Sequence, residues 1–312
     1  MDTHSQPGDR STRPTIDSFL RASPENAQAV PRELWGFGGL HGGLALAAMT
    51  AAMRPAANPA ASPAAASTAT SPAAASSAAG APASTPATQR LRSVTGRLHR
   101  AVRDPFLVVS RTDAATRSTT AASARIVAAA DEHTAADGSG SSPLASATAL
   151  FGADGPAGGP TILPTPPAVP SWREGTLFNP PPSLVPVSKY YELRVTGTNR
   201  PFAGGTEARL TAWVRLTEDE LPPDELRLLF LVDALAPSYA ALLSAPQAIP
   251  TVELSAHFSG ERAVSQWVLV DAVTTVATPD GWITETINVW GEDGSHLVEA
   301  RQLRLVRPAQ AA

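Results

Sequence analysis

The sequence predicts an α+β fold made of two repeats, each a long buried helix wrapped by a curved antiparallel β-sheet. Two observations support it. A helical segment followed by strand-like segments occurs twice in the chain, and within the helical segments residues 44–53 and 228–235 are apolar nearly all round. A helix that is apolar on every side has to be buried on more than one side. The strand-rich segments that follow it can supply the covering sheet.

The first helical segment is 38–53, GGLHGGLALAAMTAAM, and the second is 225–243, ELRLLFLVDALAPSYAALL. Strand-like segments follow at 91–102, 106–127 and 143–152 in the first repeat and at 251–260, 266–290 and 296–307 in the second. They are rich in β-branched and aromatic residues or alternate in polarity. Asp280-Gly281 and Asp293-Gly294 provide hairpin turns. Two further strands are expected at 190–197 and 207–216, where they complete the second sheet.

Composition divides the chain into parts. Residues 1–30 are polar and are expected to form a flexible N-terminal tail. The first half covers 31–154 and contains an Ala/Pro/Ser insert at 54–89, which cannot bury enough apolar surface to offset chain entropy and should be disordered. A Pro/Gly-rich linker at 155–186 leads to the second half, 187–308.

The charge and residue content exclude several classes of function. A net charge of −4, from 24 basic and 28 acidic residues, provides no broad cationic face for nucleic acid. The chain has no cysteine and its six histidines are dispersed, so no metal site is indicated. No apolar run approaches about 18 residues. We therefore expect a cytoplasmic protein with neither a nucleic-acid nor a membrane partner.

The glycine cluster before the first helix raises the possibility of a dinucleotide site. Gly36, Gly38 and Gly42 approach a G-x-G-x-x-G spacing, and helix N-termini bind pyrophosphate. That motif, however, follows a buried strand and is itself followed by an acidic residue about 20 positions later. Here PRELW precedes the glycines and the Ala/Pro/Ser insert follows them. The context disfavours a nucleotide.

The repeated arrangement resembles the double hotdog of acyl-CoA thioesterases, specifically the acyl-CoA thioesterase II type and its thioesterase-like relatives. The resemblance is strongest over 250–307, where TVELSAHFSG, WVLVDAVTT and LVEARQLRLVR keep the order and approximate spacing of the family's last three strands. It implies hydrolysis of an acyl thioester within a hotdog fold.

The resemblance also implies a catalytic set. In the thioesterase II pattern an Asp, a Thr and a Gln hold the attacking water, and these positions fall on Glu253, Thr275 and Gln302. A carboxylate can accept a proton from water, while a hydroxyl and an amide can orient it. Glu253 departs from the family Asp by one methylene. Each residue also has an ordinary structural interpretation, because Glu, Thr and Gln are common on solvated strand faces.

The first repeat lacks this polar set. Aligning the two repeats places Ser93, Ala114 and Ala149 at the positions of Glu253, Thr275 and Gln302. One site per chain is therefore expected, in the second half.

The HGG sequence before the first helix is a second candidate element. Backbone amides of Gly42 and Gly43 at a helix N-terminus could stabilise the thioester oxygen, or the glycines could only permit tight packing. His41 could donate to the thioester, or cap or pack against the helix. Asp233 interrupts an apolar helix and must be paired or face the acyl pocket, so it is the reserve catalytic candidate.

Other chemistries lack their motifs. The chain contains no G-x-S-x-G and no H-E-x-x-H, and neither helix carries the Asp and His pair of hotdog hydratases. We therefore expect a hydrolase of acyl-CoA or related acyl thioesters that uses no cofactor or metal and takes part in fatty acid metabolism. A non-catalytic acyl-thioester-binding protein and a scaffold for the insert remain alternatives. Pairing of sheets could give a homo-oligomer.

Overall fold

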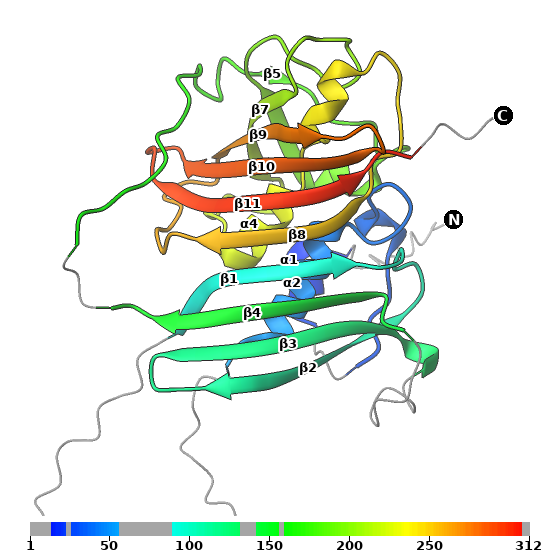
Figure 1. The fold of residues 1–312 in the computed structure, drawn as a ribbon, viewed down its shortest axis with the longest axis vertical. Helices are drawn as coiled ribbons and strands as arrows, with labels where there is room; N and C mark the ends of the chain where they lie inside the picture. Colours follow the sequence, from blue (N-terminus) through cyan, green and yellow to red (C-terminus); the bar gives the residue numbers. More distant parts are fainter. Residues whose placement is uncertain (1–13, 23–25, 56–88, 132–141, 156–158, 308–312) are drawn as a thin grey trace, which may run out of the picture.

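The computed structural model describes residues 14–22, 26–55, 89–131, 142–155 and 159–307. Within these residues the chain forms one 11-stranded antiparallel sheet with helices on one face (Figure 1). Most of the expected insert at 54–89 lies outside the described residues.

The strands of the first half are β1 (Gln89–Leu98), β2 (Phe106–Ala115), β3 (Thr119–Ala128) and β4 (Ala145–Ala153). Those that follow are β5 (Thr176–Leu177), β6 (Tyr191–Val195), β7 (Arg209–Leu216), β8 (Thr251–Phe258), β9 (Val268–Ala277), β10 (Trp282–Gly291) and β11 (His296–Leu305). The α-helices are α1 (Ile16–Leu20), α2 (Gly42–Met53) and α4 (Glu225–Val232). Short 3-10 helices lie at Arg32–Leu34, Ala129–Asp131, Pro186–Tyr190 and Ser238–Leu242.

The order of strands in the sheet is β2-β3-β4-β1-β8-β11-β10-β9-β7-β6-β5. Outward from the contact between β1 and β8, the strands therefore follow matching orders, β1-β4-β3-β2 on one side and β8-β11-β10-β9 on the other. That contact is antiparallel and aligns Thr95 with Ser255. The expected hairpin turns are present, with positive φ at Gly281 (89°) and Gly294 (83°). The strands expected at 190–197 and 207–216 are β6 and β7.

Helix α2 forms from strong helix formers, mainly alanine, leucine and methionine. It ends at Met53, and the next residue, Arg54, precedes a proline and adopts an extended ψ of 131°. At its start, His41 provides no side-chain cap. The capping acceptor comes from the other half of the chain and belongs to the candidate site.

Helix α4 is shorter than the sequence predicted. Asp224 caps its N-terminus by accepting a hydrogen bond from the Arg227 N–H at 2.9 Å. The expected segment 225–243 instead splits into α4 and the 3-10 helix at Ser238–Leu242. Pro237 accounts for the break, because a proline lacks an N–H and clashes with the carbonyl four residues earlier. Asp233 consequently lies at the end of α4, not inside a longer helix.

Helices α2 and α4 pack against each other beneath the sheet (Figure 1). Leu44, Leu46 and Met49 of α2 and Leu229 and Phe230 of α4 are at most 2% exposed. They belong to one hydrophobic core that extends across both halves. Both helices are buried on several sides, as their apolar sequences indicated.

The N-terminal segment differs from the expected flexible tail where it is described. Residues Ile16, Phe19 and Leu20 of α1 are buried in the core. Thr15 and Ser18 form a capping box. In the sequence this helix is indicated only by a capping motif and three large apolar residues. A segment with so few apolar residues resembles polar coil.

The linker also packs more closely than its composition suggested. The Trp290 indole donates to the Pro164 carbonyl at 3.1 Å, and the Trp213 indole donates to the Pro170 carbonyl at 2.9 Å. Trp172 stacks on Trp267 with ring centres 4.8 Å apart. These contacts attach the described part of the linker to the sheet of the second half.

Candidate active site

The end of α4 meets the start of α2 at Asp233. The Gly43 N–H donates to Asp233 Oδ2 at 2.9 Å, so a carboxylate from the second half caps a helix of the first half. The side chain of Asp233 is only 9% exposed. The unpaired amides and dipole at a helix N-terminus favour a negative charge at this position.

The two glycines permit this close contact. A Cβ on Gly43 would lie 2.5 Å from the Leu229 carbonyl oxygen, and one on Gly42 would lie 2.9 Å from Asp233 Oδ2. Any side chain at Gly43 would push α2 and α4 apart. Tight helix packing, one of the two interpretations of the HGG sequence, is therefore a structural requirement. Among the described residues the Gly42 N–H has no hydrogen-bond partner.

Gln302, on strand β11 of the sheet, contacts the Asp233 carboxylate. Its side chain is fully buried, and Nε2 donates to Asp233 Oδ1 at 2.7 Å. On β11 it is aligned with Leu254 of β8 and Glu285 of β10, which are also buried. Gln302 Oε1 is buried without a hydrogen-bond partner among the described residues. The site therefore holds an unused acceptor beside the carboxylate.

His41, the residue before α2, also contacts Asp233. Its Nε2 lies 2.9 Å from the backbone carbonyl oxygen of Asp233. Because a carbonyl only accepts, Nε2 must carry the hydrogen, and Nδ1 is then an acceptor. Burial lowers the pKa of His41 below its usual 6.5, and the Asp233 carboxylate opposes this only in part. His41 is thus neutral, and its buried Nδ1 has no partner in the described part of the chain.

A buried ion pair, Arg304 with Glu285, supports the site and was not anticipated from the sequence. Arg304 Nε donates to Glu285 Oε2 at 3.0 Å, and Arg304 Nη2 lies 3.5 Å from Asp233 Oδ1. The side chains of Arg304 and Glu285 are at most 6% exposed. Glu285 also accepts the Ser238 N–H. Arg304 follows Gln302 by two residues and shares its strand face, which is the sequence pattern that reveals it.

The structure does not bring Glu253 to this site. Glu253 precedes the inward-facing Leu254 on β8, so its side chain lies on the opposite face of the sheet. There it accepts a hydrogen bond from Arg97 Nε at 2.8 Å, and its side chain is 33% exposed. The expected set of Glu253, Thr275 and Gln302 is therefore not assembled, because Glu253 and Gln302 face opposite sides of the sheet.

Thr275 is also outside the site. It is exposed, and its hydroxyl donates to the Thr284 carbonyl at 3.3 Å. Its neighbour Thr274 is aligned with the buried Glu285, and Thr274 Oγ1 lies 2.8 Å from Ser238 Oγ. The threonine on the inner face is therefore Thr274, one residue earlier than the sequence alignment placed it.

Comparisons with known proteins give a family match for part of the chain and several structures of similar fold. Residues 160–306 match the family model of the acyl-CoA thioesterase C-terminal domain. A conserved protein of unknown function with a hotdog fold from Alicyclobacillus acidocaldarius has a TM-score of 0.69 at 20% identity, over 91% of this chain and 93% of the other. The chain therefore has a hotdog fold.

Two further structures carry thioesterase names. A putative thioesterase II from Thermobifida fusca has a TM-score of 0.68 at 16% identity, with 94% of this chain and 97% of that chain covered. A tesB protein from Mycobacterium avium subspecies paratuberculosis has a TM-score of 0.61 at 15% identity, with 94% and 98% covered. Together with the family match, they confirm the resemblance to thioesterase II proteins. No curated protein sequence matches the chain.

No helix in the described residues is long and apolar enough to span a membrane. The same residues contain no group of three or more His, Cys, Asp or Glu side chains placed to hold a metal ion.

Proposed function

We propose that this chain hydrolyses acyl-CoA or a related acyl thioester to the free acid and thiol, in the cytoplasm. In this proposal the chain is a double hotdog with repeats at 31–154 and 187–308, joined by the segment 155–186. The matching strand pairings in the two parts of the sheet support two repeats. The family match over 160–306 supports thioester chemistry.

The observation that carries the proposal is the buried carboxylate at the helix N-terminus. Asp233 is held by the Gly43 N–H and by Gln302, at 2.9 and 2.7 Å. An ionised carboxylate has about four acceptor sites, so it retains capacity for a water molecule. The unused Gln302 Oε1 can accept the second hydrogen of that water. Asp233 then serves as the general base, and Gln302 positions the nucleophile.

The reaction proceeds without a covalent enzyme intermediate. The water oxygen bonds to the thioester carbonyl carbon while its proton passes to Asp233. The negative charge that develops on the carbonyl oxygen is stabilised by the free Gly42 N–H at the start of α2. Collapse of this intermediate breaks the carbon–sulfur bond, and the leaving thiolate takes the proton from Asp233. Glu253 and Thr275 take no part in these steps.

A second candidate function is acyl-thioester binding without turnover. It is favoured by how fully the carboxylate is engaged, because Arg304 lies 3.5 Å from Asp233 Oδ1 in addition to the two hydrogen bonds. A carboxylate held in this way could serve only to fix the two helices. Homo-oligomer formation stays a prediction under either function.

Thiol release from a panel of acyl-CoAs, from acetyl-CoA to palmitoyl-CoA, distinguishes the two functions. Hydrolysis predicts stoichiometric release of CoA at a rate proportional to protein concentration. Binding alone predicts a measurable Kd for a non-hydrolysable alkyl thioether of CoA, with no thiol release above the buffer rate. The second result would overturn the proposed hydrolysis.

A further inference from the structure

The candidate site reaches the protein surface at Gly42. Gly42 is partly exposed, yet a Cβ on it would lie 2.9 Å from Asp233 Oδ2 and 2.9 Å from Leu98 Cδ1. Leu98, the last residue of β1, is partly exposed as well. A thiol group attached to an acyl carbon beside Asp233 can therefore leave the site past Leu98.

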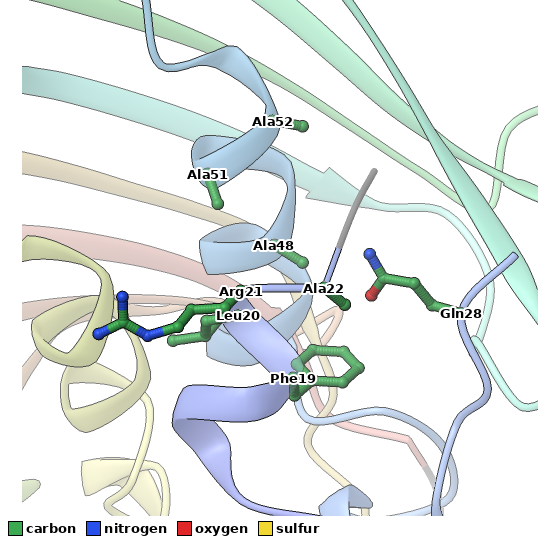
Figure 2. A pocket seen from close by; sticks show the side chains of 8 residues that line it. All are labelled: Phe19, Leu20, Arg21, Ala22, Gln28, Ala48, Ala51 and Ala52. Carbon is green, nitrogen blue, oxygen red and sulfur yellow. The ribbon is translucent and has the colours of Figure 1, made fainter. Parts of the chain in front are cut away.

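The cavity of about 200 Å³ beside the second half of α2 is separate from this exit (Figure 2). Its walls come from the end of α1, from Gln28 and from Ala48, Ala51 and Ala52 of α2. None of its lining residues hydrogen-bonds to the Asp233 or Gln302 side chain. The surface around the start of α2 is therefore the one that meets the substrate outside the site.

Two loops are fixed against each other on that surface. The Leu40 N–H donates to the Val102 carbonyl oxygen at 2.8 Å. A Cβ on Gly39 would lie 2.9 Å from that oxygen, so glycine is needed for the contact. The glycine-rich turn 36–39, just before α2, is thereby held against the loop 99–105, which follows Leu98.

An exposed aromatic ring and a cation lie together on these loops. Phe37, in the turn, is 80% exposed. Arg103 Nε donates to the Gly38 carbonyl at 2.6 Å, so the guanidinium lies against the turn that carries Phe37. Neither Arg103 nor Arg100, three residues earlier on the same loop, forms an ion pair with a described residue. Both guanidinium groups retain N–H donors for an anion.

We propose that Phe37, Arg100 and Arg103 bind the head group of coenzyme A, the 3′-phosphorylated ADP at the far end of its pantetheine arm. The inference rests on the proposed function and names CoA as the thiol of its substrate. Guanidinium groups match phosphate oxygens in geometry and charge. Phe37 offers a face on which adenine stacks. A carrier protein presents a phosphate but no purine, and the exposed ring therefore favours CoA.

Calorimetric titration of the whole protein with 3′-phospho-ADP tests the inference. The parent should bind it, and Arg103→Met should raise the Kd by roughly tenfold or more, as expected for a hydrogen bond between charged groups. Phe37→Leu keeps an apolar side chain but removes the ring, and it should also raise the Kd by roughly tenfold. Arg262→Met is the matched control. Arg262 is exposed and follows β8 at the end of the sheet opposite Leu98, so the Kd should not change.

Steady-state kinetics gives a second readout. Head-group contacts are made equally in the ground state and the transition state, so Arg103→Met should raise KM for decanoyl-CoA and leave kcat unchanged. Decanoyl-pantetheine carries no phosphate, and its KM and kcat should be the same in Arg103→Met as in the parent.

Failure of the parent to bind 3′-phospho-ADP would overturn the inference, as would a parent-like Kd in either variant. Phe37→Leu keeps the test decisive if Arg103→Met folds poorly, because Phe37 is an exposed side chain. Binding of a phosphopantetheinylated carrier protein in place of 3′-phospho-ADP would assign the loops to that protein and overturn the CoA site.

The proposed function is tested separately by thiol release from decanoyl-pantetheine. Hydrolysis of this thioester without binding of 3′-phospho-ADP would refute the head-group site and leave the proposed function standing. Binding of 3′-phospho-ADP without thiol release from any thioester would refute hydrolysis and leave the head-group site standing.

Discussion

The Gln302 amide donates a 2.7 Å hydrogen bond to the Asp233 carboxylate, across 69 positions of sequence. It connects the last strand of the sheet to the end of α4. Through Asp233 it also reaches the first turn of α2, which belongs to the other half of the chain. One carboxylate thus links three elements from the two halves of the chain.

Gln302→Ala should lower kcat by roughly 100-fold with little change in KM, because a group that orients the attacking water acts mainly in the transition state. Steady-state thiol release measures both constants. The melting temperature should also fall, since the substitution leaves Asp233 short of a buried partner. Gln266→Ala, which removes a glutamine bound to Arg215, is the matched control and should retain the parent kcat. A parent-like kcat in Gln302→Ala would show that the amide has no role in turnover.

Glu253→Gln and Thr275→Val should each keep kcat within about threefold of the parent, as expected for positions outside the core and away from the site. Glu253 contacts Arg97 on the opposite face of the sheet, and Thr275 is exposed near the end of β9. Thr274→Val is the informative comparison, because Thr274 contacts Ser238 on the inner face. A fall in kcat near 100-fold in Glu253→Gln would mean that the family's residue pattern predicts the catalytic residues better than the site around Asp233 and Gln302 does.

Stability should depend on pH through His41. Burial lowers its pKa in the folded protein below 6.5, so the unfolded chain binds a proton at a higher pH than the folded chain does. The free energy of unfolding therefore falls as pH drops through 6.5 and is unaffected by His41 above it. His41→Gln keeps a donor but does not titrate. Its melting temperature should fall less than the parent's between about pH 7.5 and about pH 5.

Equal losses of melting temperature in the two proteins would contradict this account of His41. His296, whose pKa burial also lowers, is present in both and cancels in the comparison.

The repeat of elements could be read from the sequence because it depends on local patterns. Apolar runs, strand alternation and the Asp-Gly turns each identify an element by itself. The break after Val232 was missed by the prediction of one helix over 225–243, although Pro237, which cannot continue a helix, is a local signal for it. The short α1 was not, because its stability comes from burying Ile16 and Phe19 against distant parts of the chain.

The candidate site was only partly predictable, for a geometric reason. Aligning strands by motif fixes a residue's position along the strand but not its face, and a shift of one residue reverses the face. Gln302 and Asp233 were identified and lie together. Glu253 falls on the outer face, and Thr275 is exposed one residue beyond the inner-facing Thr274. Strand alternation places Arg304 on the face of Gln302, but its pairing with Glu285 depends on strand register across the sheet, which no local pattern specifies.

The central claim is that Asp233 is the general base. Asp233→Asn preserves the shape of the side chain and removes its ability to accept a proton from water, so the most direct measurement is kcat for CoA release by this variant. We predict a fall of at least roughly 100-fold, the usual contribution of a positioned acid or base, with KM and the far-UV circular dichroism spectrum close to the parent. Thiol release by Asp233→Asn at the parent rate would contradict the claim and leave the carboxylate with a structural role only.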